Sequence, residues 1–341
     1  MEKRHYGVGL IGAGWVAGEY VKAFRDHPQT EIVGIFSRTP GKAGQLLKTY
    51  GVSGREYASI DAFFADPGID IVVSCTHPDV RAIHCTRAAE TGRHIVIEKP
   101  VALTRSKVAQ LCKAVAKAGV KTVTSFVLRW NPQFMTVRQL IDDGVLGDLI
   151  YGEADYWHPL RCGSPGSPYI RKDMAGSSFL SGGCHAADML RWLGGEVSEV
   201  SAFSAAGKRV TSFEFDPVVV ASVRFENGAV GKLSSLMDGD TPYRFNCRLF
   251  GTNGSIQNNE VYSSRNYPGA RDYWTFPANT PNSGVVIDLP FKAEVDHFIE
   301  CIDNDVESHA SIYDSSKSMA ICFAIDESLA SGGHPVKVVE V

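Results

Sequence analysis

The chain has 341 residues, of which 44% are apolar and 21% are charged, values typical of a globular protein with about two domains. Its formal net charge is −4 and Lys and Arg do not cluster, which argues against nucleic acid as the main partner. No apolar run reaches the roughly 18 residues that a membrane-spanning helix needs. We therefore expect a cytoplasmic globular protein that binds neither nucleic acid nor a membrane.

The eight cysteines are scattered along the chain, and none forms a Cys-x-x-Cys pair. No His-Glu-x-x-His spacing is present either. Zinc sites commonly use these spacings. The sequence therefore predicts no metal site, and we expect the cysteines to be reduced, buried side chains.

The first 125 residues alternate short runs of Val and Ile with amphipathic stretches. Near-continuous apolar strands are typical of a parallel sheet that helices cover on both faces. The predicted strands cover residues 6–11, 31–36, 69–75, 94–97 and 121–125, and the predicted helices cover residues 14–26, 40–50, 78–91 and 104–118. This pattern predicts an α/β Rossmann domain over residues 1–125.

After residue 130 the strands become longer, and apolar and polar residues alternate along several of them, as in a sheet with one open face. The predicted strands cover residues 149–157, 197–205, 217–225, 229–237 and 243–250, and the predicted helices cover residues 132–143, about 185–193, and one or two segments across 291–331. The turn Asn227-Gly228 is a hairpin signal. We predict an α+β domain over residues 126–341 with a large, mostly antiparallel open sheet. Because the second face of that sheet needs a cover, we expect a homodimer or homotetramer formed through it.

A glycine-rich turn joins the first predicted strand to the first predicted helix. The segment Gly12-Ala13-Gly14-Trp15-Val16-Ala17 fits G-x-G-x-x-[G/A], a pattern that is weak alone and stronger between a strand and a helix. Gly12 permits a tight turn, and Gly14 leaves room for a pyrophosphate at the helix N-terminus. The alternative is an ordinary strand-to-helix turn. The pattern predicts a dinucleotide cofactor.

The end of the second predicted strand bears on the choice of cofactor. NAD sites usually place Asp or Glu there to accept a hydrogen bond from the ribose 2′-OH, whereas this chain has Ser37-Arg38. A guanidinium can bind a 2′-phosphate, so NADP is favoured over NAD. The alternative is that Arg38 is a solvated residue.

A Glu-Lys-Pro element, Glu98-Lys99-Pro100, follows the strand over residues 94–97. Ligands of open α/β sheets bind at the carboxyl ends of the strands. Lys99 is therefore placed to hydrogen-bond the oxygen of a reacting carbinol or carbonyl.

At these residues the chain resembles the Gfo/Idh/MocA family of NAD(P)-dependent sugar and polyol oxidoreductases. The resemblance runs over nearly the full length, and its most specific piece is the Glu-Lys-Pro element with the preceding Gly-x-His. The other matching segments are Gly12-Ala13-Gly14, Thr76-His77-Pro78, Arg129-Trp130-Asn131-Pro132, the segment 141–147 and Gly183-Cys184-His185-Ala186-Ala187-Asp188. The resemblance implies hydride transfer between NAD(P) and a CH–OH group of a sugar, a sugar derivative or a cyclic polyol.

The family resemblance also implies two catalytic residues. Lys99 corresponds to the Lys that orients the reacting oxygen, and His185 corresponds to a general acid/base. The family often carries Asp-x-Gly-x-His, and Ser181 stands here in place of the Asp. His185 begins an amphipathic stretch, so capping or packing is the alternative role for it. Asp188 lies three residues further on, where it could orient His185, contact substrate or form a local helix salt bridge.

The remaining candidates are assigned by position. Further cofactor contacts are expected from Trp15 and Val16 at the turn and from Thr76, His77, Pro78 and Glu98. Substrate contacts are expected from Arg129, Trp130, Ser181 and Asp188 and from the aromatic and basic residues Tyr156, Trp157, His158, Arg161, Tyr169 and Arg171. Two other functions stay open: redox-assisted glycoside cleavage with tightly bound NAD(P), and a non-catalytic cofactor-binding regulator.

Overall fold

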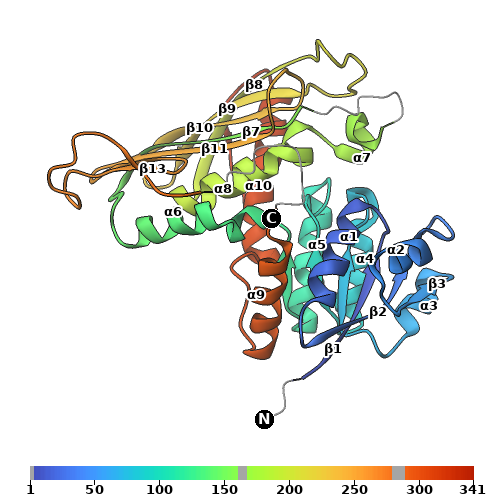
Figure 1. Cartoon of the computed structure of the whole chain (residues 1–341). Coiled ribbons are helices and arrows are strands. Elements are labelled where there is room, and N and C mark those ends of the chain that lie inside the picture. Colours follow the sequence, from blue (N-terminus) through green and yellow to red (C-terminus); the bar gives the residue numbers. More distant parts are fainter. Residues whose placement is uncertain (1–3, 160–166, 279–288) are drawn as a thin grey trace. The chain divides into compact units, whose positions relative to one another are not determined.

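The structure is a computed structural model that describes residues 4–159, 167–278 and 289–341 (Figure 1). The chain forms two compact units: unit 1 is Met1–Val127 with Pro290–Ser316, and unit 2 is Leu128–Leu289 with Lys317–Val341. The predicted division at residue 125 therefore misses one segment. Residues 290–316 return to unit 1, where helix α9 (Phe291–Asp303) packs against α1 (Trp15–Arg25).

Unit 1 contains a six-stranded parallel sheet in the order β3-β2-β1-β4-β5-β6, the strand order of dinucleotide-binding folds. The strands are β1 (Tyr6–Ile11), β2 (Thr30–Phe36), β3 (Arg55–Tyr57), β4 (Ile71–Ser74), β5 (His94–Ile97) and β6 (Thr122–Thr124). The predicted Rossmann fold is confirmed. No strand was predicted at β3, because it has three residues, two of them exposed and charged, and so lacks an apolar run.

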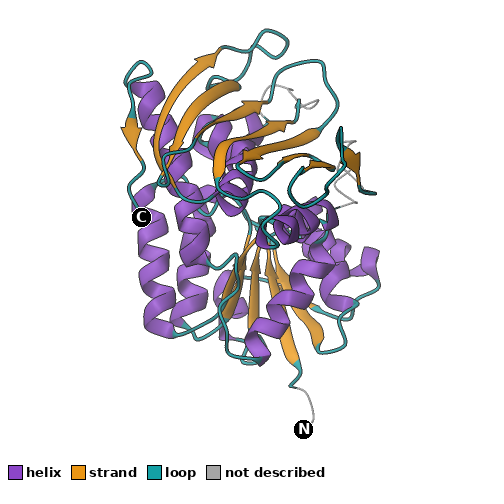
Figure 2. Cartoon of the chain, turned by 90° about the vertical axis from the view of Figure 1, so that its left-hand side faces the viewer, coloured by secondary structure: helices purple, strands orange, loops and turns teal. Residues whose placement is uncertain are grey.

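Helices flank the parallel sheet (Figure 2). Besides α1 and α9, they are α2 (Lys42–Tyr50), α3 (Ile60–Ala65), α4 (Pro78–Glu90) and α5 (Arg105–Ala118). Side-chain caps begin two of them: the Ser59 hydroxyl accepts the Ala62 N–H, and the Thr104 hydroxyl accepts the Lys107 N–H. The α2 helix ends at Gly51, whose positive φ of 63° suits glycine.

Unit 2 contains a nine-stranded sheet in the order β14-β13-β12-β11-β7-β10-β9-β8-β15. The strands are β7 (Leu149–Trp157), β8 (Val197–Ala205), β9 (Val218–Phe225), β10 (Val230–Leu236), β11 (Arg244–Gly251), β12 (Ser255–Gln257), β13 (Glu260–Tyr262), β14 (Trp274–Thr275) and β15 (Val336–Lys337). Among the strands of this sheet in the described residues, only β7 and β10 pair in parallel, so the predicted mostly antiparallel sheet is confirmed. The predicted turn at Asn227-Gly228 joins β9 to β10, with the Asn227 side chain accepting the Ala229 N–H.

The helices of unit 2 lie against one face of this sheet. They include η1 (Val127–Trp130), α6 (Pro132–Asp142), η2 (Pro168–Ile170), α7 (Lys172–Ala175), η3 (Phe179–Gly183) and α8 (Cys184–Gly194); α10 (Ile312–Ala330) runs from unit 1 into unit 2. The α8 helix contacts β7, β10 and β11. Along β9, buried and exposed residues alternate, as expected for a sheet covered on one face. None of the helices in the described residues is both long enough and apolar enough to cross a membrane.

Candidate functional site

The glycine turn of unit 1 has the geometry that a pyrophosphate site needs. Gly12 has a φ of 105°, and a Cβ there would lie 2.6 Å from the Cys75 carbonyl oxygen, so only glycine fits. A Cβ at Gly14 would project into open space. The first turn of α1 carries neither a side-chain cap nor an acidic residue, which leaves its N–H groups and its positive dipole end for an anion. These features fit a dinucleotide.

The predicted cofactor residues of unit 1 come together along one edge of the parallel sheet. Strands β1, β4 and β5 are neighbours and parallel, so the segments that follow them share the carboxyl edge. Gly12 to Val16 follow β1, Thr76 to Pro78 follow β4 and open α4, and Glu98 and Lys99 follow β5. Lys99 is partly exposed there, and the Lys99–Pro100 peptide is cis.

Arg81 joins two of these segments and was not among the predicted residues. It lies on α4, it is 5% exposed, and its guanidinium donates to the carbonyl oxygens of both Thr76 and Pro100. A planar guanidinium can donate in several directions at once, so one side chain holds both segments. Its position five residues after Thr76, on the helix that opens there, is the signal that could have indicated it.

Ser37 and Arg38 follow β2, the strand beside β1. The Ser37 hydroxyl accepts the Thr39 N–H at 3.2 Å, and Arg38 is exposed. Burial lowers the pKa of His77, and the positive charges of Arg81 and Arg38 lower it further, against the effect of Asp79. The charge of Arg38 therefore reaches the segment that opens α4, and no carboxylate occupies positions 37 and 38.

In unit 2 a single π-helical turn, η3, leads directly into the helix that carries His185. The turn contains Ser181, and its glycines allow close packing: a Cβ at Gly182 would lie 2.2 Å from the Tyr156 ring, and one at Gly183 would lie 2.9 Å from the Phe179 ring. Such π turns are frequent at functional sites. His185 then lies in the first turn of α8 and is 6% exposed.

His185 lies in an aromatic cluster built from β7 and the start of β11. The Tyr156 ring stacks on it at 6.0 Å between centroids, and the Phe245 ring meets it edge-on at 5.6 Å. The Tyr156 hydroxyl lies 2.7 Å from His158 Nδ1, and the His158 ring contacts Tyr243 at 4.4 Å. Burial raises the pKa of Tyr156 well above its ordinary value, so this phenol is neutral.

Two members of the cluster, Tyr243 and Phe245, were missed by sequence reasoning. Phe245 pairs directly with Tyr156 across the β7–β11 ladder. Cross-strand pairs of this kind depend on register, which a single sequence does not reveal. The alternation Tyr243, Phe245, Cys247, which begins just before β11 and continues into it, was the available signal for an apolar face.

Trp157 does not join this cluster, although it was predicted to contact substrate together with Tyr156. Successive residues of a strand point to opposite faces, and Trp157 lies on the face of Asp155. Its indole N–H donates to the Ser234 hydroxyl at 3.2 Å, and the same hydroxyl donates to Asp155 at 2.5 Å. Arg171 forms an exposed ion pair with Asp173, Tyr169 is 43% exposed, and Arg161 lies outside the described residues.

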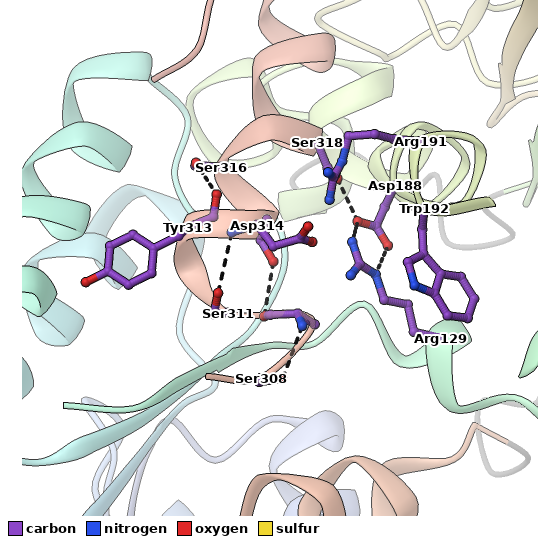
Figure 3. Close-up of polar contacts among 12 residues, drawn as sticks. Arg129, Asp188, Arg191, Trp192, Ser308, Ser311, Tyr313, Asp314, Ser316 and Ser318 are labelled. Atoms are coloured by element: carbon purple, nitrogen blue, oxygen red, sulfur yellow. Dashed lines mark hydrogen bonds and ion pairs between the residues drawn. The ribbon is translucent and has the colours of Figure 1, made fainter. Parts of the chain in front are cut away.

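Arg129 and Asp188 form an interior ion pair in unit 2 (Figure 3). Arg129 Nε and Nη2 donate to the two carboxylate oxygens of Asp188 at 2.8 and 2.5 Å, and the Ser318 hydroxyl donates to Asp188 at 2.6 Å. The residues are 1% and 2% exposed, and Trp130 is 5% exposed. Asp188 thus pairs with a distant guanidinium and not with a neighbour on its own helix. The predicted substrate contacts of Arg129, Trp130 and Asp188 remain predictions.

Taken unit by unit, the arrangement offers two kinds of chemistry. Unit 1 presents uncapped N–H groups, an exposed guanidinium and an ammonium along one sheet edge, which suits a phosphate-bearing cofactor. Unit 2 presents an imidazole beside neutral aromatic rings, and an imidazole exchanges protons near neutral pH. No group of three or more His, Cys, Asp or Glu suited to a metal ion occurs within residues 4–159, 167–278 and 289–341.

Comparison with known families assigns both units. Residues 6–126 match the oxidoreductase family with an NAD-binding Rossmann fold, and residues 134–257 match the GFO/IDH/MocA C-terminal domain. Together the two matches cover more than half of the chain. The chain is an oxidoreductase, and its unit 1 contains an NAD-binding Rossmann fold.

Among individual proteins, an inositol 2-dehydrogenase of Rhizobium meliloti strain 1021 is 33% identical over 188 residues, which span 55% of this chain and 54% of that protein. A scyllo-inositol 2-dehydrogenase (NAD(+)) of Bacillus subtilis strain 168 is 23% identical across 89% of this chain and 88% of its own length. The solved structure of a levoglucosan dehydrogenase in complex with NADH superposes with a TM-score of 0.89, at 23% identity, and covers 99% of this chain and all of that one. With its two units matched in order, the chain belongs to the Gfo/Idh/MocA family of oxidoreductases.

Proposed function

We propose that the protein transfers a hydride between NAD(P) and a CH–OH group of a sugar, a sugar derivative or a cyclic polyol. The observation that carries the proposal is the position of Lys99 at the carboxyl edge of the parallel sheet, two strands from the glycine turn. Inositol dehydrogenases among the relatives support the substrate class. Aromatic rings such as those around His185 suit the C–H faces of a carbohydrate ring.

Each candidate catalytic residue has a distinct task. Oxidation of an alcohol removes a hydroxyl proton and a hydride from the same carbon, and the cofactor supplies hydride acceptance when it is bound. Lys99 orients the reacting oxygen and stabilises its developing negative charge. His185 takes the hydroxyl proton, or returns it in the reverse reaction. In place of the family Asp, Ser181 leaves His185 without a carboxylate at that position.

The test is a panel of sugars and polyols assayed with NAD and NADP, in which reduced cofactor is measured as product. Lys99→Ala and His185→Ala should each lower kcat by about a hundredfold or more, because a positioned charge or proton acceptor contributes that much. Cofactor affinity, measured by the fluorescence of bound NAD(P)H, should change little in His185→Ala. Lys117→Ala and His334→Ala are matched controls at exposed positions of units 1 and 2. Normal turnover in Lys99→Ala or His185→Ala rejects the role of that residue.

We propose NADP as the preferred cofactor. Arg38 is exposed at the end of β2 with no carboxylate beside it at position 37, which favours a 2′-phosphate. Arg38→Ala should raise KM for NADP about tenfold or more and leave KM for NAD within about twofold, because the phosphate contact is present in only one cofactor. Equal kcat/KM for the two cofactors in the unaltered protein contradicts this preference.

We further propose a homodimer or homotetramer formed through the open face of the nine-stranded sheet. Phe203 on β8 and Val220 on β9 are 71% and 45% exposed and pair directly across the ladder. Exposed apolar side chains that adjoin on a sheet are typical of a contact surface. Light scattering should give at least twice the mass of one chain, and Phe203→Asp should shift it toward the monomer. An unaltered monomeric protein contradicts this assembly.

A further inference from the structure

A buried polar cluster of unit 1 lies next to the Glu-Lys-Pro element and has no role in the proposed chemistry. One member of this cluster is Glu294 on α9, which is fully buried. The Tyr20 hydroxyl lies 3.3 and 3.4 Å from the two carboxyl oxygens of Glu294, and the Ser125 hydroxyl lies 3.3 Å from one of them. Tyr20 donates to Ser125 at 2.5 Å, and Ser125 is also hydrogen-bonded to the Glu98 carboxyl. One serine hydroxyl thus stands between two buried carboxyl groups.

The hydrogen count at Ser125 favours a proton on one of the two carboxyl groups. A serine hydroxyl has one hydrogen to donate and two positions at which to accept. It accepts from Tyr20, and it can donate to only one carboxylate. The other carboxyl group can bond to Ser125 only by donating its own hydrogen. Two buried carboxylates that share a partner would also repel each other if both were ionised.

The surroundings of the two carboxyl groups decide which one holds the proton. Burial raises the pKa of Glu98, while the charges of Arg81 and Lys99 and the Lys99 N–H, 3.1 Å away, act in the opposite direction. For Glu294, burial and the charge of Glu98 together raise the pKa well above its ordinary value, against weaker hydrogen bonds from Ser125 and Tyr20. The cations therefore favour an anion at Glu98 and a neutral acid at Glu294.

The other titratable groups that face the pair are neutral. Burial raises the pKa of Tyr20 on α1 well above its ordinary value, and the charges of Glu294 and Glu98 raise it further. The pKa of the Cys75 thiol, which follows β4, is raised by burial and by the same two carboxyl groups. The Glu98–Glu294 pair thus holds the only negative charge among these four groups.

We propose that Glu294 is a positioning residue for Lys99, because it holds the proton of the Glu98–Glu294 pair. Glu98 then remains an anion, which accepts a hydrogen bond from the backbone N–H of Lys99 and balances the charge of the Lys99 ammonium. The effect on turnover rests on the proposed function. The shared proton itself does not, because it follows from contacts within unit 1.

The activity test compares neutral substitutions at the two carboxyl groups. Glu294→Gln supplies an amide that donates to Ser125 as the acid does, so kcat at neutral pH should stay within about threefold of the unaltered value. Glu294→Ala and Glu98→Gln should lower kcat about tenfold or more, with a smaller change in KM for the cofactor, because Lys99 loses its anchor or its counter-charge. Glu300→Gln, at an exposed position of the same helix, is the matched control. If kcat falls in Glu294→Gln and stays normal in Glu98→Gln, the proton lies on Glu98 and the proposal is overturned. If kcat falls equally in all three variants, Glu294 acts only through packing, which overturns the proposal too.

A second measurement tests the proton without turnover. A carboxyl group with a raised pKa in the folded state contributes stability that is complete below its unfolded pKa and is lost as pH rises through the folded pKa. Glutamine does not titrate, so the Tm of Glu294→Gln relative to the unaltered protein should increase as pH is raised from about 5 to about 9. The difference for Glu300→Gln should stay flat. A Tm difference for Glu294→Gln that does not change with pH overturns the shared proton. If the Tm difference rises with pH but the protein turns over no substrate, the shared proton stands and only the proposed function is rejected.

Discussion

The two units of the molecule bury carboxyl groups in opposite ways. In unit 2, Asp188 lies in the interior with a guanidinium, because Arg129 donates to both of its oxygens. In unit 1, Glu294 is just as buried but its contacts are hydroxyl groups, from Tyr20 and Ser125. Burial costs an unpaired anion far more than a neutral acid. A carboxyl group with a cation beside it can keep its charge, and one among hydroxyls keeps its proton.

The difference bears on what each group can do. A buried bidentate ion pair holds two side chains in one geometry, which suits a link between η1, which carries Arg129, and α8. A neutral acid beside an anion can respond to pH and to nearby charge. The first arrangement fits a structural element, and the second fits a group that adjusts its neighbours.

The largest effect is expected from breaking the ion pair of unit 2. Arg129→Met should lower the free energy of unfolding by about 3–5 kcal/mol, because Asp188 is left buried without a cation. Urea denaturation measures this change. Arg224→Met is the matched control, since Arg224 forms an exposed pair with Glu199 at 3.7 Å and its loss should cost less than about 1 kcal/mol.

The double variant Arg129→Met/Asp188→Leu completes this test. Replacing both charges by apolar groups removes the unpaired anion, so much of the lost stability should return. An Arg129→Met protein as stable as the Arg224→Met control would show that Asp188 does not depend on its partner.

Asp326 on α10 is a partly buried carboxyl group of unit 2 whose pKa is also raised. Burial raises its pKa from 3.8 to about 6, against a hydrogen bond from Ser177 and the charge of Lys172. Stability from the protonated form is complete below the unfolded pKa and is lost as pH rises through about 6. Asp326→Asn should therefore be more stable than the unaltered protein by roughly 1–2 kcal/mol above about pH 7, and the advantage should vanish near pH 4.

Thermal unfolding at several pH values measures the effect of Asp326→Asn. Glu260→Gln, at an exposed position of β13, should show no such trend. A pH-independent difference between Asp326→Asn and the unaltered protein would place the Asp326 carboxyl in an ordinary environment and limit the comparison to Asp188 and Glu294.

The smallest effect is expected from removing one hydroxyl of the unit 1 cluster. Tyr20→Phe keeps the ring contact with Phe291, at 5.0 Å between centroids, and loses the bond to Ser125. The free energy of unfolding should fall by about 1 kcal/mol, as for a neutral hydrogen bond. Tyr313→Phe, at a residue that is 37% exposed, is the control. If Tyr20→Phe lowers the free energy of unfolding as much as Arg129→Met does, the hydroxyls stabilise an ionised Glu294, contrary to the neutral acid inferred there.

Much of the fold follows from the sequence alone because the signals are local. The strands over residues 6–11 and 149–157 have the predicted bounds, since an apolar run that ends at glycine and an alternating run of nine residues each mark a strand clearly. Gly12 was assigned to a tight turn, and its φ of 105° agrees. The short strand at Arg55–Tyr57 carries no such signal.

The missed parts of the candidate site depend on contacts between distant residues. Arg129 and Asp188 are 59 positions apart and Ser125 and Glu294 are 169 apart, so neither pairing leaves a local pattern. The position of Trp157 was predictable, however, because the strand period of two separates it from Tyr156. Which loops approach each other along a sheet edge was predictable too, once the strand order was known.

The return of α9 to the first unit has a consequence for biosynthesis. When the ribosome has translated the first 127 residues, the helix that packs against α1 and supplies Glu294 has not yet been made. Side chains of the nascent chain such as Tyr20, whose ring contacts Phe291 on α9, then lack part of their eventual cover, which invites aggregation or chaperone binding. A gene fragment that stops at codon 127 should accordingly yield an insoluble product, whereas one that fuses residues 290–316 to that fragment should restore a folded nucleotide-binding unit.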